Sequence, residues 1–308
     1  MHYCIQLANG LRLCFTDTPE TKSWVDRLSA IMQLAPSVPG PESRRVTFIR
    51  SSLTDEIEPT RNLKPDLRST LPGSGWKLRD HNLLQFWYHS DVTDVICNIG
   101  YKINDKLEIL KMWQLTRFIY RWAQNSGGIP FHAGLIEKHG VGIVLAAQGG
   151  TGKSTCCNRI PPPWRALCDD EVLVVLDEHG CYMAHPFPTW SDYLLRRQEK
   201  TWNVQQYVPL RAVFFLEKSQ HDQAIAMGQG QSAICINYSV MQNLDGSFSE
   251  MDREEYLPIK KRLFDNSCQL AKTVPVFKLR FSLTGQFWEE IEDVLKTSVH
   301  QTLVWKNA

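Results

Sequence analysis

Alternating apolar and polar residues dominate the first third of the chain and predict strands. The dipeptide Asn9-Gly10 stands between two such segments and favours a tight hairpin turn, because both residues tolerate positive φ angles. Apolar residues at helical spacing from Trp24 to Ile31 predict one helix, which Pro36 ends. The expected strands span 3–8, 11–16, 46–50, 76–81, 83–89 and 94–101, the helix spans 21–35, and a long surface loop spans 51–75.

The periodicity changes in the second part of the chain, where helices alternate with strands. Residues 105–124 carry Leu115, Phe118 and Trp122 on one helical face, and Gly127-Gly128 ends that helix. Further strands are expected near 130–136, 141–147, 165–168, 171–177, 181–185, 210–217 and 274–281, and further helices near 232–242, 252–271 and 287–299. The pattern predicts an α/β protein with a β-rich N-terminal domain over 1–104 and a second domain over 105–308.

Composition narrows the class of protein. The 308 residues include 43% hydrophobic and 22% charged residues, which is typical of a folded chain. Lys and Arg number 34 and Asp and Glu number 33, so the formal net charge is +1. A chain this close to neutral has no global basic field that would attract nucleic acid or an anionic membrane.

The sequence shows no signal peptide, and we therefore expect a cytoplasmic location. The N-terminal segment lacks a basic region followed by an apolar core, and no apolar run is long enough to span a bilayer. None of the nine cysteines has the C-x-x-C spacing of a zinc ribbon or a thioredoxin-like site. We therefore expect reduced, mostly buried thiols.

The strongest chemical signal is a glycine-rich segment that follows a predicted strand. Residues 147–154 read A-Q-G-G-T-G-K-S, a Walker A loop with alanine where glycine is commonest. Its glycines let backbone N–H groups turn toward phosphate oxygens, Lys153 reaches the β- and γ-phosphates, and Ser154 offers a hydroxyl to Mg²⁺. The residues expected to bind ATP or another nucleoside triphosphate are Gly149, Gly150, Thr151, Gly152, Lys153, Ser154 and Thr155.

Two aspartates follow this loop closely. The run Pro161-Pro162-Pro163 limits the intervening helix to about two turns, because proline cannot continue a helix. The next strand therefore returns to the nucleotide with Asp169 and Asp170. Carboxylates at this place suit a kinase, in which one accepts the proton of the acceptor hydroxyl and another holds Mg²⁺ directly or through water.

A second acidic pair, Asp177-Glu178, offers a competing assignment. It follows the apolar run 172–176 and so imitates the Walker B strand of the mechanical ATPases. His179-Gly180 and another β segment come directly after it. This context favours the solvated tip of a hairpin.

The segment Phe131-His132-Ala133-Gly134, the following hairpin, the phosphate loop and the paired aspartates together resemble the HPr kinase/phosphorylase family and its looser relatives, the HPr-kinase-like kinases. The resemblance covers roughly 115–240. It implies that the second domain is a P-loop kinase domain of the HPr-kinase-like type. It also implies that Asp170 deprotonates a serine hydroxyl, that Asp169 helps to hold Mg²⁺, and that His132 lines the phosphate site.

One segment departs from that family. The stretch E-I-R-G-L-G, which serves HPr docking and phosphorolysis there, is missing, and residues 184–192 read A-H-P-F-P-T-W-S-D instead. This form resembles the divergent branch found with peptide natural-product clusters, some of whose members are similar to peptidyl-serine kinases. Trp190 is either a wall of the acceptor site or a core residue. The basic residues Arg196, Arg197 and Lys200 either attract an acidic peptide or form a solvated face, and we favour the solvated face.

These observations predict an ATP- and Mg²⁺-dependent kinase whose acceptor is a serine hydroxyl of a peptide or small protein, such as a ribosomally made precursor peptide. The first alternative is a kinase of small-molecule hydroxyl groups, because the same loop and carboxylate serve any alcohol. The second is a nucleotide-gated module that binds a peptide through its β-rich domain without phosphotransfer. The sequence leaves open whether the chain forms a homo-oligomer.

Overall fold

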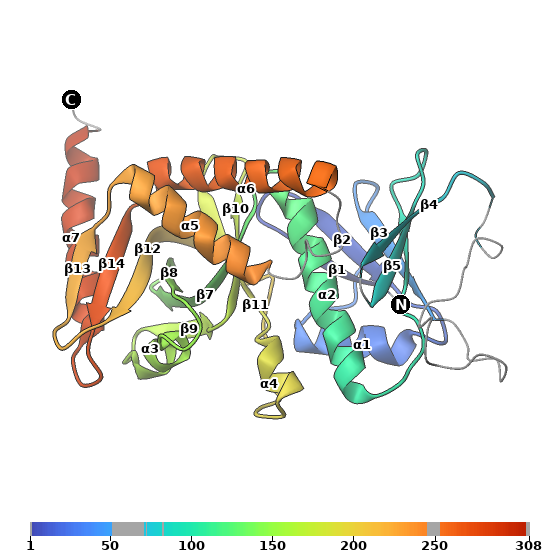
Figure 1. Cartoon of the computed structure of the whole chain (residues 1–308), viewed down its shortest axis with the longest axis horizontal. Helices are drawn as coiled ribbons and strands as arrows, with labels where there is room; N and C mark the ends of the chain where they lie inside the picture. The colour runs from blue at the N-terminus through green and yellow to red at the C-terminus, as the bar shows by residue number, and fades with distance from the viewer. Residues whose placement is uncertain (1, 51–70, 72, 82, 245–252, 306–308) are drawn as a thin grey trace.

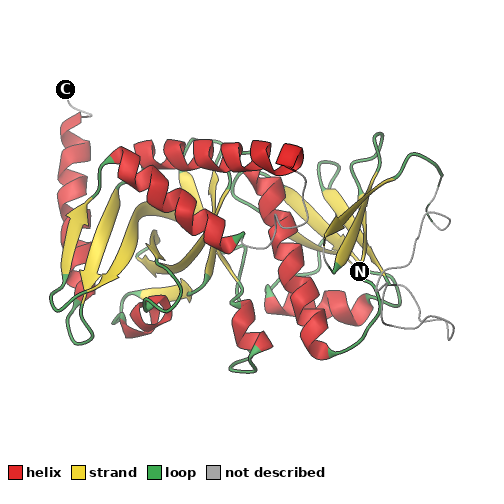
Figure 2. Cartoon of the chain, in the orientation of Figure 1, coloured by secondary structure: helices red, strands yellow, loops and turns green. Residues whose placement is uncertain are grey.

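The computed structural model describes residues 2–305 except 51–70, 72, 82 and 245–252, and from residue 297 onward it describes the backbone alone. Most of the expected loop 51–75 therefore lies outside the described residues. The chain is a mixed α/β protein with two β-sheets and, in its described part, seven helices (Figures 1 and 2).

The first sheet contains the six strands that precede residue 104. They are β1 (His2–Gln6), β2 (Arg12–Thr16), β3 (Arg44–Ile49), β4 (Lys77–His81), β5 (Leu84–Tyr88) and β6 (Val95–Asn98), in the order β1-β2-β3-β6-β5-β4. The helix α1 (Lys22–Ile31) packs on this sheet, where the ring of Trp24 lies 5.1 Å from that of Phe48. Every strand predicted in this region is present.

The helix α2 (Asp105–Gln124) lies between the two sheets (Figure 1). The side chain of Asn104 caps it by accepting a hydrogen bond from the backbone N–H of Leu107. Phe118 of α2 stacks on Phe86 of the first sheet, with ring centroids 4.2 Å apart. The hydroxyl of Tyr120 reaches the second sheet, so one continuous cluster of buried side chains joins both sheets through α2.

The second sheet contains the eight later strands. They are β7 (Ile129–Lys138), β8 (Val141–Ala146), β9 (Arg165–Cys168), β10 (Glu171–Leu176), β11 (Tyr182–Phe187), β12 (Val208–Lys218), β13 (Gln223–Ala226) and β14 (Val276–Phe281). The main order is β11-β10-β7-β8-β12-β14-β13, β9 pairs with β7, and β8, β12 and β14 run parallel.

Helices cover both faces of this sheet because neighbouring side chains of a strand point to opposite faces. Leu135 packs into the core under α5 (Gln229–Asn243) and α6 (Arg253–Thr273), whereas Ile136 packs toward α3 (Lys153–Arg159) and α7 (Phe287–Trp305). The sequence did not predict β13 or α4 (Trp190–Leu194). Both are short, and β13 is exposed or half-buried throughout, so neither carries a clear hydrophobic period.

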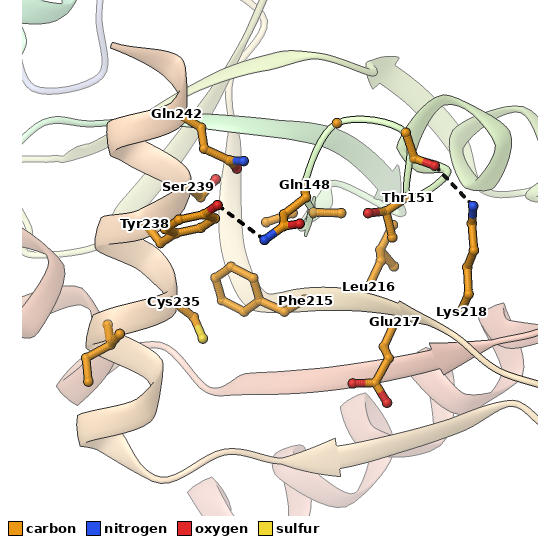
Figure 3. A pocket seen from close by; sticks show the side chains of 15 residues that line it. Gln148, Thr151, Phe215, Leu216, Glu217, Lys218, Cys235, Tyr238, Ser239 and Gln242 are labelled. Atoms are coloured by element: carbon orange, nitrogen blue, oxygen red, sulfur yellow. Dashed lines mark hydrogen bonds between the residues drawn. The ribbon is translucent and has the colours of Figure 1, made fainter. Parts of the chain in front are cut away.

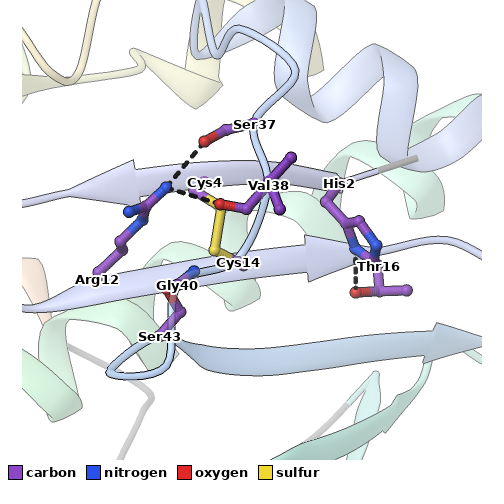
Figure 4. Close-up of a disulfide and its surroundings, with 9 residues drawn as sticks. All are labelled: His2, Cys4, Arg12, Cys14, Thr16, Ser37, Val38, Gly40 and Ser43. Atoms are coloured by element: carbon purple, nitrogen blue, oxygen red, sulfur yellow. Dashed lines mark hydrogen bonds between the residues drawn. A yellow bond between two sulfur atoms is a disulfide. The ribbon is translucent and has the colours of Figure 1, made fainter.

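The expectation that all cysteines are reduced is wrong for two of them. Cys4 and Cys14 form a disulfide between β1 and β2 (Figure 4). They lie directly opposite each other in the antiparallel pair, with their Cα atoms 4.0 Å apart. This position brings their side chains close enough to bond.

A buried histidine ties the two halves of the chain together. His185 is fully buried on β11, its Nε2 accepts a hydrogen bond from the backbone N–H of Ala8 (3.1 Å), and its Nδ1–H donates to the carbonyl of Val204 (2.8 Å). Burial lowers the pKa of His185 to about 4. The imidazole is therefore neutral at neutral pH.

Within the described residues, each helix is either too short or too polar to cross a lipid bilayer.

Candidate functional site

The glycine-rich loop connects β8 to α3, as the sequence predicts. Gly150 and Gly152 have φ angles of 76° and 117°, a left-handed conformation that favours glycine. A Cβ on Gly152 would lie 3.2 Å from Cζ of Phe281, so space also restricts this position. Thr151 closes a turn by donating its N–H to the carbonyl of Gln148 (3.2 Å). The predicted glycine-rich turn therefore connects β8 to α3.

The topology of the sheet gives the loop its place. The parallel strands β8, β12 and β14 end at the same edge, at Ala146, Lys218 and Phe281 respectively. The loop leaves this edge, where ligands bind in parallel sheets, and the N-terminus of α3 follows it. Gly134 on β7 lets α3 approach closely, because a Cβ there would lie 2.5 Å from Sγ of Cys157.

Lys153 is the first residue of α3, and its side chain is 7% exposed. Its Nζ lies 3.0 Å from Nε2 of His132 and donates a hydrogen bond to the carbonyl of Ala147 (3.1 Å). Burial lowers the pKa of Lys153, and the nearby carboxylate of Asp170 opposes this shift. The antiparallel pairing of β7 with β8 brings His132 beside the start of the loop, because Ala133 pairs with Ala146.

His132 also contacts the second of the two aspartates that follow the loop. Its Nε2 lies 3.1 Å from Oδ1 of Asp170. The two strands are held in this register by the pairing of Glu171 with His132 and by a hydrogen bond from the N–H of Ala133 to the carbonyl of Asp170 (2.8 Å). The structure thus brings together Lys153, His132 and Asp170, three of the residues predicted for the site.

A single ring nitrogen takes part in both contacts. Nε2 of His132 accepts from Lys153 when it carries a lone pair, and donates to Asp170 when it carries a proton. The two hydrogen bonds therefore belong to different protonation arrangements of the imidazole. Whether Nε2 carries a proton therefore decides whether His132 forms a hydrogen bond with Asp170 or with Lys153.

Asp169 faces a different partner. Its Oδ1 accepts a hydrogen bond from the hydroxyl of Thr189 (2.6 Å), directly before α4. Asp192 of α4 lies near this pair, and burial together with the charge of Asp169 raises the pKa of Asp192. Thr189 and Asp192 were not predicted as site residues, although both belong to the segment 184–192 that departs from the HPr kinase/phosphorylase family.

Glu171 directly follows the aspartate pair, is the first residue of β10 and is buried. It accepts hydrogen bonds from Nε1 of Trp113 (2.8 Å) and the hydroxyl of Tyr120 (2.7 Å), both on α2. Burial and the nearby Asp170 raise the pKa of Glu171 to about 7. Nothing in its local sequence distinguishes it, because α2 supplies its partners from a distant segment.

The residues predicted to hold Mg²⁺ provide suitable oxygen atoms. Asp169 offers a carboxylate, and Ser154 is exposed on the first turn of α3 beside the exposed Thr155. Among the described residues, no group of three His, Cys, Asp or Glu side chains forms a metal cage. This set fits Mg²⁺, which binds to one or two carboxylates, waters and phosphate oxygens.

A cavity of about 620 Å³ adjoins the loop (Figure 3). Its walls are the loop, the end of β12 and one side of α5. Gln148 donates a hydrogen bond across it to the hydroxyl of Tyr238 (3.2 Å), and Lys218 donates to the carbonyl of Gly150 (3.1 Å). The described residues that line it are Ala146, Ala147, Gln148, Gly149, Gly150, Thr151, Phe215, Leu216, Glu217, Lys218, Ile234, Cys235, Tyr238, Ser239 and Gln242.

Two alternatives from the sequence are decided by the structure. Asp177 caps the turn between β10 and β11, where its Oδ1 accepts from the N–H groups of His179 and Cys181, and Glu178 is exposed. The second acidic pair is therefore a hairpin tip, as predicted. Trp190 is 1% exposed and belongs to the core.

A comparison with protein families matches residues 95–296 to a family described as "ScmC: SynChlorMet cassette protein ScmC". The match begins at β6 and includes α2, the loop, both aspartates and every strand of the second sheet. No curated protein matches the chain in a search by sequence.

Proposed function

The chain belongs to the SynChlorMet cassette protein ScmC family, and we propose that it is an ATP-dependent kinase that transfers the γ-phosphoryl group to a serine hydroxyl of a peptide or small protein. The contact chain from Lys153 through His132 to Asp170 carries this proposal. It provides a cation for phosphate oxygens and a carboxylate for a hydroxyl proton, both in contact with the same ring nitrogen of His132. Phosphoryl transfer to an alcohol uses both groups.

Each residue has a stated role in the proposed reaction. The N–H groups of the loop and Lys153 bind the phosphates and neutralise charge on the transferred group. Asp170 accepts the hydroxyl proton as the serine oxygen bonds to the γ-phosphorus and the bond to the nucleoside diphosphate breaks. Asp169 and Ser154 would hold Mg²⁺, which supplies further charge neutralisation at the phosphate oxygens.

We propose that the first sheet binds the acceptor peptide. In the order of the described strands β4 stands at an outer edge, where an extended peptide can pair through its backbone. The resemblance to peptidyl-serine kinases supports a precursor peptide as the acceptor. We propose a cytoplasmic location for this reaction and no nucleic acid or membrane partner.

Mass spectrometry of acceptors after incubation with ATP and Mg²⁺ tests the proposal. We expect phosphoserine on a peptide, no transfer to small alcohols, and strongly reduced product formation with the Asp170→Asn variant. Transfer to small alcohols instead would favour the small-molecule kinase. ATP binding without transfer to any acceptor would favour the nucleotide-gated module.

A further inference from the structure

The cavity beside the loop has a wall that the proposed phosphoryl transfer does not use. On α5, Tyr238 is 50% and Ile234 is 65% exposed, and both side chains line the cavity. Phe215 of β12 lies beside Tyr238, and Cys235 completes this apolar side (Figure 3). Two aromatic rings on the walls of one cavity offer flat surfaces to a planar ligand.

The opposite wall is the phosphate loop itself. Residues 146–151 line the cavity, so a molecule that fills it lies against the loop. Lys218 contributes a second cation there, with Nζ at 3.1 Å from the carbonyl of Gly150. A ligand that fits both walls has an anionic end at the loop and a planar end at α5.

The size of the cavity and its polar groups further restrict which ligands it can hold. A volume of about 620 Å³ is typical of a small-molecule site and fits one nucleotide. The amides of Gln148 and Gln242 line the cavity and can donate to or accept from the edge of a base. Glu217 adds little net negative charge, because Lys278 (2.8 Å) and Arg280 (3.0 Å) pair with it.

We propose that this cavity holds the nucleoside part of the bound nucleotide, with the base against Tyr238 and Phe215 and with Lys218 on the phosphate side. The proposal rests on the proposed function for the presence of a nucleotide, and it adds the residues that recognise the base. The competing occupant, an apolar side chain of the acceptor peptide, is an outcome of the test.

Calorimetry with two probes separates the two ends of the cavity. ADP has a nucleoside and inorganic tripolyphosphate has none. We expect Tyr238→Ala to weaken ADP binding about 10- to 100-fold, the effect of losing one stacked base, and to leave tripolyphosphate binding within about twofold. Tyr238→Phe keeps the ring, so it should stay near wild type for both probes, whereas Lys153→Ala should weaken both.

Alkylation of Cys235 gives an independent readout in the unmodified protein. Cys235 is half-buried in the cavity wall, and Cys181 is exposed at a distant turn. We expect ADP to slow the reaction of Cys235 with iodoacetamide, tripolyphosphate to have little effect on it, and Cys181 to react equally in all cases. Equal protection by both probes, or none by ADP, would overturn the proposal.

The outcomes also separate this inference from the proposed kinase activity. If the protein transfers phosphate to a peptide and the Tyr238→Ala variant binds ADP normally, the proposed base site is contradicted and the proposed kinase activity is supported. If ADP binding depends on Tyr238 but the protein transfers phosphate to no acceptor, the proposed base site is supported and the proposed kinase activity is contradicted. Protection of Cys235 by an acceptor peptide alone would assign the cavity to the acceptor.

Discussion

The hydroxyl of Thr189 donates a hydrogen bond to Oδ1 of Asp169 over 2.6 Å. Thr189 is 4% exposed and ends the extended segment that leads from β11 into α4. A buried donor at this distance fixes the rotamer of the carboxylate. Thr189 therefore has the contacts of a positioning residue for the proposed Mg²⁺ ligand.

Replacing this hydroxyl should weaken the metal site. We expect Thr189→Val to raise the Mg²⁺ concentration needed for half-maximal transfer about 10-fold, because a hydrogen bond to a charged group contributes about 1.5–3 kcal/mol. Thr189→Ser keeps the hydroxyl and should restore the wild-type requirement. A Mg²⁺ titration of transfer measures the effect, and an unchanged requirement in Thr189→Val would contradict the role.

The two aspartates should separate binding from chemistry. Asp170→Asn should keep ATP affinity within a few-fold and cut transfer by about 10²–10⁴, the usual contribution of a positioned base. Asp169→Asn should mainly raise the Mg²⁺ requirement. Calorimetry and transfer rates on the same preparations distinguish the effects. An exchange of the two effects between the variants would mean that the assigned roles are reversed.

Much of this site could be predicted because its signals are local. The glycines, Lys153 and the strand before them lie within one short segment, and Asp169 and Asp170 follow it closely. Thr189, Glu171 and Tyr238 were missed because each acquires its partner from a distant segment. Contacts of this kind depend on the sheet order, which a single sequence does not specify.

The disulfide shows how a small difference in register escapes such predictions. A two-residue turn at Asn9-Gly10 would place Cys4 opposite Phe15. The hairpin instead pairs Gln6 with Arg12, which shifts the register by one residue and sets Cys14 opposite Cys4. A one-residue shift changes every cross-strand partner.

Reduction of this disulfide should destabilise the protein. For a sequence separation of 10 residues we expect reductant to lower the free energy of unfolding by about 3 kcal/mol. Urea unfolding with and without reductant measures this difference. The double variant Cys4→Ala, Cys14→Ala is the control and should be insensitive to reductant.

Thiol counting checks the same disulfide directly. The unfolded chain should take up label on seven cysteines before reduction, namely those that are free in the structure. Labelling of every cysteine without reductant would show that the bond is absent. The test is most stringent on protein recovered from a reducing compartment, because disulfides rarely persist there.

His185 should make stability depend on pH. Its pKa is about 4 in the folded chain and near 6.5 in an unfolded one, so below about pH 6.5 the unfolded state binds a proton that the folded state does not. The stabilising effect is complete above that pH and declines as the pH falls toward 4. Between pH 7 and pH 5 the free energy of unfolding should drop by about 2 kcal/mol through this group.

The variant His185→Gln isolates this contribution. Glutamine can accept from the N–H of Ala8 and donate to the carbonyl of Val204 without titrating. We expect urea unfolding of the variant to show a pH dependence smaller by about 2 kcal/mol over the same interval. NMR of the wild-type imidazole provides a second measurement, in which His185 should stay neutral at pH 5. Equal pH dependence in both proteins, or protonation of His185 near pH 6.5, would contradict the buried neutral imidazole that joins the two halves of the chain.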